Sequence, residues 1–173
     1  MSALPLEAEV SAETPDVVAR FSGMVYSIAL THTKSRGDAD DVFQEVFLTY
    51  HRKQPECVDD EHRKAWLIKT TLNCARRAVA DSWRTRVVPI RPADMDMLAD
   101  TAFTFATAEQ DAIFAAVSKL SEVYRSVLHL FYFEDLPIAK IATLLGLEQG
   151  AVKVRLSRGR ALLREQLGGY FDD

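Results

Sequence analysis

The chain has 173 residues, of which 48% are hydrophobic and 27% are charged. The hydrophobic content is ample for packed cores, and the charged content is normal for a soluble protein. No apolar run approaches the roughly 20 residues that cross a bilayer. Two isolated cysteines exclude a disulfide framework and a CxxC metal site. We therefore expect a reduced, cytoplasmic protein without membrane insertion, metal or cofactor.

Apolar residues recur at helical spacing after an acidic N-terminal tail (residues 1–16), and this predicts an all-α fold. A first helix begins at Val17, and Gly37 ends it or lies in the turn that follows. A second helix follows Asp38 and stops before Pro55, and a third begins near Glu61. We expect the three helices to form one small domain over residues 17–86. The residues expected to face inward on the second and third helices are Ala39, Val42, Phe43, Val46, Phe47, Tyr50, Ala65, Ile68, Leu72, Ala75 and Val79.

An extended acidic linker is predicted over residues 87–106, because prolines interrupt the helical pattern and three aspartates follow them. Thr107 to Gln110 has the form of a capping box and starts the next helix. Ser121 is expected to cap another helix, with Val123, Val127, Leu128 and Phe131 facing inward. A second helical domain therefore covers residues 107–168, and residues 169–173 form a tail.

The segment from Leu136 to Arg164 has the pattern of a helix-turn-helix. Ala142 allows a close helix crossing, Gly146 makes the sharp turn, and Val152 fills the crossing point. The second helix of the pair carries lysine and arginine around its outer surface, as a helix that enters the major groove of DNA does. The alternative is a plain helical hairpin with a solvated basic face.

Charge is distributed in blocks that support contact with nucleic acid, although the net charge is −4. Residues 1–60 have a net charge of −6, and residues 61–91 carry eight basic and two acidic side chains. Residues 92–135 return to −6, and the six basic groups after them all lie between Lys140 and Arg164. Two basic blocks between acidic ones predict two DNA-facing surfaces. The four histidines, in contrast, are scattered and favour unrelated surface or partly buried positions; they are His32, His51, His62 and His129.

Three motifs, in order, give the chain a resemblance to bacterial sigma factors of the extracytoplasmic-function (ECF) type. The first is GDADDVFQEVFLTYHR (37–52), and the second is KAWLIKTTLNCARR (64–77). The third, residues 120–167, is similar to the fourth region of the family almost throughout. The resemblance implies that residues 17–86 are sigma region two and residues 107–168 sigma region four.

The resemblance also implies binding roles for two helices of region two. Residues three or four positions apart share a helix face, and the face of Asp41, Gln44, Glu45 and Leu48 is similar to the one that docks on the coiled coil of the polymerase β′ subunit. Strand opening needs apolar surface, a polar base pocket and phosphate-binding cations. The residues implied for the −10 element are Trp66, Lys69, Asn73, Arg76, Arg77 and Arg84.

Region four is implied to read the −35 element and to contact the β flap of the polymerase. The matching DNA-binding residues are Lys153, Arg155, Ser157 and Arg158. This sequence departs from the family pattern at Ala151 and Val154, which replace the usual Thr and Ser, and at Cys74, which follows Asn73. Without the resemblance, Asp41 and Glu45 would be assigned to a solvated helix face.

The sequence thus predicts a sigma factor that binds core RNA polymerase, recognises −10 and −35 promoter elements and promotes strand opening. Its expected partners are core polymerase, promoter DNA and an anti-sigma factor. We see no catalytic constellation in the sequence and do not expect an enzyme. One alternative is a stand-alone helix-turn-helix regulator, which leaves the second and third helices without a role. The other is a sigma mimic that only binds an anti-sigma factor.

Overall fold

The computed structural model describes residues 13–85 and 108–168, and every regular element in these two ranges is an α-helix. The first range contains α1 (Glu13–Thr33), α2 (Arg36–Lys53) and α3 (Asp60–Thr85). The second contains α5 (Ala108–Ser118), α6 (Glu122–Tyr132), α7 (Ile138–Leu145) and α8 (Gln149–Leu167). The predicted linker and the capping threonine Thr107 lie outside the described residues.

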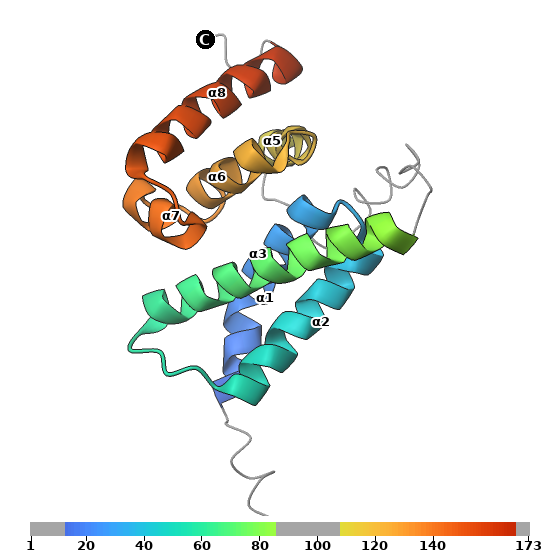
Figure 1. The fold of residues 1–173 in the computed structure, drawn as a ribbon, viewed down its shortest axis with the longest axis vertical. Coiled ribbons are helices and arrows are strands. Elements are labelled where there is room, and N and C mark those ends of the chain that lie inside the picture. The colour runs from blue at the N-terminus through green and yellow to red at the C-terminus, as the bar shows by residue number, and fades with distance from the viewer. Residues whose placement is uncertain (1–12, 86–107, 169–173) are drawn as a thin grey trace, which may run out of the picture.

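Helices α1, α2 and α3 pack around a core of their own, and the second group of helices lies against them (Figure 1). Ala39, Val42, Val46, Phe47 and Tyr50 form the buried stripe predicted for α2. The turn before α2 differs from the prediction. Lys34 takes the positive φ of 56° there, whereas Gly37 lies inside the first turn of α2. The helix begins at Arg36, before Asp38 and not after it, and the hydroxyl of its N-cap Ser35 accepts a hydrogen bond from the Asp38 backbone N–H.

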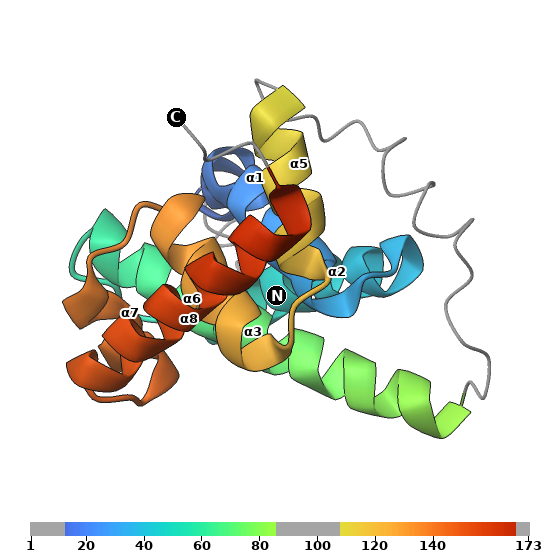
Figure 2. The same ribbon diagram turned by 90° about the horizontal axis from the view of Figure 1, so that it is seen from above.

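The second unit is built on α6 and α8, with α5 and α7 packed beside them (Figure 2). Val127 and Leu128 of α6 are buried as predicted, and Phe131 is partly buried. Val123 was expected to face inward, but it is 45% exposed because it lies on the outer side of the first turn of α6. The buried polar residues of α6, Arg125, Ser126 and His129, were not predicted.

The two units contact each other through a shared hydrophobic core. Ile28 of α1 and Ile68 and Leu72 of α3 are buried in the same apolar cluster as Val127 and Leu128 of α6. Apolar side chains of this size each contribute about 1.5–3 kcal/mol when they are fully buried. The described arrangement, in which α1 and α3 contact α6 and α7, is called the closed arrangement below.

Ion pairs and a hydrogen bond surround this shared core. Arg76 Nε of α3 donates to Glu122 Oε1 of α6 at 2.6 Å, and Lys140 Nζ of α7 lies 2.8 Å from Glu61 Oε2. Lys64 Nζ donates to the carbonyl oxygen of Glu134 at 3.0 Å. The two ion pairs are largely exposed and contribute about 0–1 kcal/mol each. They therefore fix the orientation of the two units and add little to the stability of the contact between them.

Candidate nucleic-acid interface and partner-binding face

Helix α2 presents part of the predicted partner-binding face to solvent. Asp41, Gln44 and Leu48 are exposed, and Leu48 exposes 55% of its surface although it is apolar. Glu45 is half-buried and accepts a hydrogen bond from Arg77 of α3 at 2.8 Å. An exposed leucine among acidic and amide side chains provides one apolar anchor on a polar face.

The residues predicted on α3 for the −10 element do not form one surface in the closed arrangement. Lys69 and Asn73 are exposed and lie four positions apart on one side of the helix. Arg76 turns toward the second unit through its ion pair with Glu122, and Arg77 turns toward α2. The side chain of Arg84 lies outside the described part of the chain.

Trp66 is a partly buried residue of the first unit and not an exposed stacking platform. Its ring packs edge-on against Tyr50 of α2, with 5.6 Å between the ring centroids. Such edge-to-face pairs stabilise a core beyond the area that they bury. In this arrangement Trp66 is therefore a packing residue of the first unit.

Cys74 follows Asn73 on α3 and faces the interior of the first unit. It is 2% exposed, and Arg77 Nη2 donates a hydrogen bond to its Sγ at 3.3 Å. Burial raises the pKa of the Cys74 thiol, and the nearby Glu45 carboxylate adds to this shift. Burial and a raised pKa are typical of a thiol that packs in a core.

The helix-turn-helix has the geometry that the sequence predicted. Gly146 ends α7 with a φ of 65°, and the Leu147 backbone N–H returns to the Ala142 carbonyl at 2.9 Å. Val152 is completely buried at the start of α8. A Cβ added at Gly159 would lie 2.8 Å from Leu128 Cδ1, so this glycine permits the close crossing of α8 and α6.

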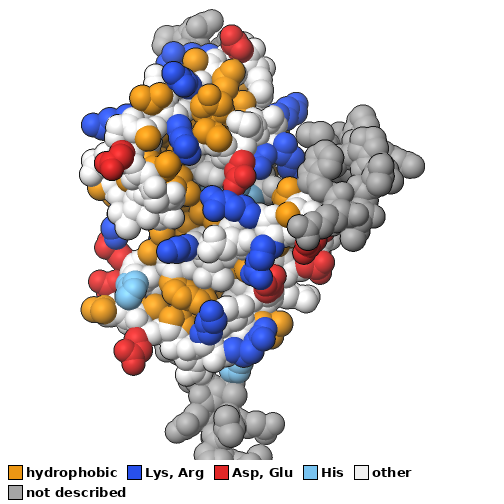
Figure 3. Space-filling view, in the orientation of Figure 1, with side chains coloured by type: hydrophobic (Ala, Val, Ile, Leu, Met, Phe, Trp, Pro, Cys, Tyr) orange, Lys and Arg blue, Asp and Glu red, His pale blue; other side chains and the backbone are white. Residues whose placement is uncertain are grey.

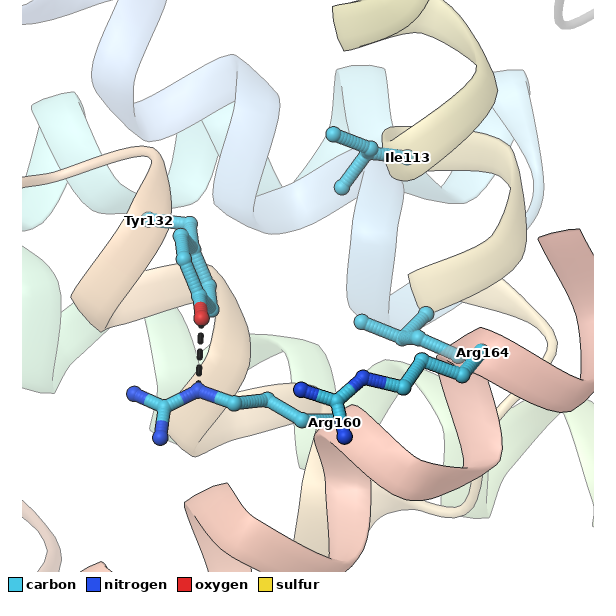
Figure 4. A pocket seen from close by; sticks show the side chains of 5 residues that line it. Ile113, Tyr132, Arg160 and Arg164 are labelled. Atoms are coloured by element: carbon cyan, nitrogen blue, oxygen red, sulfur yellow. Dashed lines mark hydrogen bonds between the residues drawn. The ribbon is translucent and has the colours of Figure 1, made fainter. Parts of the chain in front are cut away.

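The outer surface of α8 carries most of the predicted −35 residues. Lys153, Ser157 and Arg158 are exposed, and Arg155 is half-buried. Arg160, which the sequence places on the same basic helix, turns instead toward α6. Its Nε donates to the Tyr132 hydroxyl at 2.6 Å, and it lines a small pocket (Figure 4). Lysine and arginine side chains lie over both units on the face seen in Figure 3, with acidic groups among them.

A buried polar cluster between the units is the feature that the sequence did not predict. Thr31 donates its hydroxyl proton to the Ser27 carbonyl, so His129 Nδ1 donates to Thr31 Oγ1 at 3.1 Å. His32 Nδ1 donates to the Ile28 carbonyl, and His32 Nε2 accepts from the Ser126 hydroxyl at 3.0 Å. The expectation of unrelated histidines was wrong for this pair.

Burial lowers the pKa of His32 to about 3, and the neighbouring His129 adds to the shift. His32 is consequently neutral at neutral pH, which matches its role as an acceptor from Ser126. The two histidine rings are 6.3 Å apart between centroids and belong to different units, α1 and α6. Residues about 100 positions apart thus satisfy each other's hydrogen bonds, and no local sequence pattern signals this.

Other kinds of site are absent from the parts of the chain that the structure describes. Among these residues, no three His, Cys, Asp or Glu side chains are grouped as metal ligands. Within the same two ranges, each helix is too short or too polar to cross a membrane.

Comparison with known proteins assigns both units. The sigma-70 region 2 family matches residues 17–85, and the sigma-70 region 4 family matches residues 110–163. The "Probable RNA polymerase sigma factor RfaY" of Xanthomonas campestris pv. campestris is 32% identical over 163 residues, a match that covers 90% of this chain and 40% of that protein. The chain thus spans less than half the length of that relative.

Two further relatives match over most of their own length. The ECF RNA polymerase sigma factor SigW of Bacillus subtilis is 23% identical over 165 residues, covering 88% of this chain and 87% of SigW. The sigma factor RpoE of Bartonella quintana, crystallised with the anti-sigma factor NepR, has a similar fold, with a TM-score of 0.69 and 20% identity over 90% of this chain and 96% of that one. Because both regions match in order along one chain and ECF sigma factors are among its relatives, this protein belongs to the sigma-70 family, as a sigma factor of the ECF type.

Proposed function

We propose that this chain binds core RNA polymerase and directs it to promoters through two separate DNA-reading surfaces. The observation that carries this proposal is the combination of three exposed faces in one sigma-70 chain. They are the Leu48 face of α2, the Lys69 and Asn73 side of α3, and the Lys153 and Arg158 side of α8. Bond formation in transcription is assigned to the polymerase, and the chain supplies promoter selection and strand opening.

The α2 face is proposed to dock on the coiled coil of the β′ subunit. Leu48 supplies apolar contact area, and Asp41 and Gln44 supply charge and hydrogen bonds that complement a basic partner. A hot-spot residue at the centre of an interface costs about 2 kcal/mol or more in binding free energy when it is truncated. We therefore expect Leu48 to dominate the affinity of this face.

This docking is tested with Leu48→Asp, with Val58→Asp as the matched control because Val58 is 90% exposed between α2 and α3. Affinity for purified core polymerase is measured by fluorescence anisotropy of the labelled full chain. Leu48→Asp should weaken binding at least tenfold, whereas Val58→Asp should bind as the wild type does. Equal affinities of both variants and the wild type would reject the α2 face as the docking surface.

Promoter contact is proposed to use α8 at the −35 element and α3 at the −10 element. Lys153, Arg155 and Arg158 give about three phosphate or base contacts, which correspond to a slope of about −3 in a plot of log affinity against log salt. Binding of region four alone is therefore weak. Attachment to polymerase and the second contact at α3 supply the rest of the affinity.

The closed arrangement is proposed to open when the chain joins polymerase and DNA. The −10 and −35 elements are centred about 25 base pairs apart, which is about 85 Å at 3.4 Å per base pair. A compact protein of this length has a radius of gyration of about 16 Å. One closed molecule cannot present α3 and α8 at that separation, so the contact between α3 and α6 must be broken.

An anti-sigma factor is proposed as a further partner. The similar Bartonella quintana sigma factor was crystallised with an anti-sigma factor. An anti-sigma factor that binds the closed arrangement better than the open one would keep the two DNA-reading surfaces from acting together, because a ligand shifts an equilibrium toward the state that it binds better.

A further inference from the structure

The outermost position on helix α8 is occupied by an apolar residue. The buried stripe of this helix consists of Val152, Leu156, Gly159 and Leu163. Val154 lies two residues from both Val152 and Leu156, which at about 100° per residue places it opposite the stripe. It is 48% exposed. The outward side of an amphipathic surface helix normally carries polar residues, so a valine at its centre is unexpected.

The neighbours of Val154 on this side are either small or suited to contact DNA. Ser157 and Arg158 follow three and four residues later and are exposed, so they flank Val154 one turn along the helix. Gly150 precedes it by four residues. A Cβ added at Gly150 would meet nothing within 4 Å, unlike one added at Gly159, which would meet Leu128.

Among the described residues, no packing contact therefore requires a glycine at position 150. Its φ is not in the left-handed region that favours glycine. A bare backbone one turn before an exposed valine leaves room for another molecule to approach α8 closely at this point.

The chemistry of base edges identifies a ligand for Val154. A valine side chain has no donor or acceptor and cannot pair with the polar groups of guanine, adenine or cytosine in the major groove. The apolar group exposed there is the C5 methyl of thymine. Resting on the function proposed above, we propose that Val154 packs against the C5 methyl of one thymine in the −35 element and makes that base pair a determinant of promoter choice.

The test removes that methyl group without changing base pairing. Promoters are first selected by transcription with core polymerase and the full chain from a library with a randomised upstream element. In a selected promoter, each thymine of the two strands is then replaced in turn by deoxyuridine, which lacks only the C5 methyl. Burial of one methyl group corresponds to about a fourfold change in affinity. Replacement of one particular thymine should therefore lower initiation about fourfold when the protein concentration is limiting.

Val154→Ala provides the cross-check, and Val123→Ala is the matched control because Val123 is a similarly exposed valine on α6. With Val154→Ala, which withdraws the apolar contact by two methyl groups, the difference between thymine and deoxyuridine templates should fall well below fourfold at the sensitive position. With Val123→Ala, the fourfold difference should persist. Circular dichroism of both variants establishes that the helices are retained.

Three results would overturn the inference. The selected upstream elements could lack an invariant thymine, every deoxyuridine template could initiate like its thymine parent, or the fourfold loss could persist in Val154→Ala. These three results differ from a failure of the proposed function. If the proposed function fails, the wild-type chain and core polymerase give no transcript that depends on the upstream element. In that last case the inference falls together with the function.

Discussion

Acidification should destabilise the closed arrangement through His32. In the folded chain the pKa of His32 is lowered to about 3, mainly by burial and further by its electrostatic interaction with His129, Arg125 and Arg76. In the unfolded chain it has the ordinary value of about 6.5. The unfolded state therefore binds one more proton than the folded state between these two values. By linkage, the stability contributed by neutral His32 is present above pH 6.5 and is lost as the pH falls toward 3.

The magnitude follows from the same two pKa values. Each pH unit inside this window costs about 1.4 kcal/mol for one proton. Between pH 7 and pH 5 the free energy of unfolding should fall by about 2 kcal/mol on account of His32 alone. The expected loss of unfolding free energy depends little on the pKa of His32 in the folded chain, because that pKa lies well below 5. Other groups titrate over the same range, so a variant without the imidazole is needed for comparison.

The assay is urea unfolding of wild type and His32→Gln at pH 7 and pH 5, followed by circular dichroism. Glutamine can accept the hydrogen bond from Ser126 but does not titrate. The wild type should lose about 2 kcal/mol more than the variant between the two pH values. Equal losses in both proteins would mean that His32 is not held neutral at the contact between α1 and α6.

Two further outcomes follow from packing. Gly159→Ala should destabilise the chain by about 1–3 kcal/mol in urea unfolding, because the added Cβ would lie 2.8 Å from Leu128 Cδ1; unchanged stability would show that α8 and α6 do not cross this closely. Of the two thiols, the half-buried Cys57 should react with a thiol reagent at pH 8 well before Cys74, whose pKa burial raises. Equal rates in the folded chain would contradict the burial of Cys74, and the same reagent in urea provides the control.

Local patterns were sufficient to predict the helices and the helix-turn-helix. Gly146 lies where the backbone takes a positive φ, Val152 lies where the helix crossing buries an apolar side chain, and the buried stripe of α2 has regular helical spacing. Exposed cations on α8 followed from the same periodicity, since residues that do not face the core must face solvent. Val123 was assigned to the wrong side because it lies in the first turn of α6, where periodicity is least informative.

The contact between the two units could not be predicted in this way. His32 and Ser126 are polar residues that are buried because each satisfies the other across 94 positions of sequence. Polar residues are normally assigned to the surface. Their burial can be predicted only when the hydrogen-bond partner that satisfies them is known. The same contact redirects Arg76 to Glu122, and the contact with Glu45 redirects Arg77. The −10 residues are therefore spread over several directions, although they share one stretch of α3.

Promoter-dependent initiation measures whether the chain directs core polymerase to promoters and whether α8 contributes to their selection. Run-off transcription is carried out with core polymerase on a genomic library, with wild type, Arg158→Ala and the control Lys119→Ala, which removes a positive charge from the same unit outside α8. Wild type and control should direct core polymerase to a common set of promoters with an upstream and a downstream element. Arg158→Ala should lose about tenfold in initiation. Absence of binding to core polymerase, or unchanged transcription with Arg158→Ala, would contradict the account.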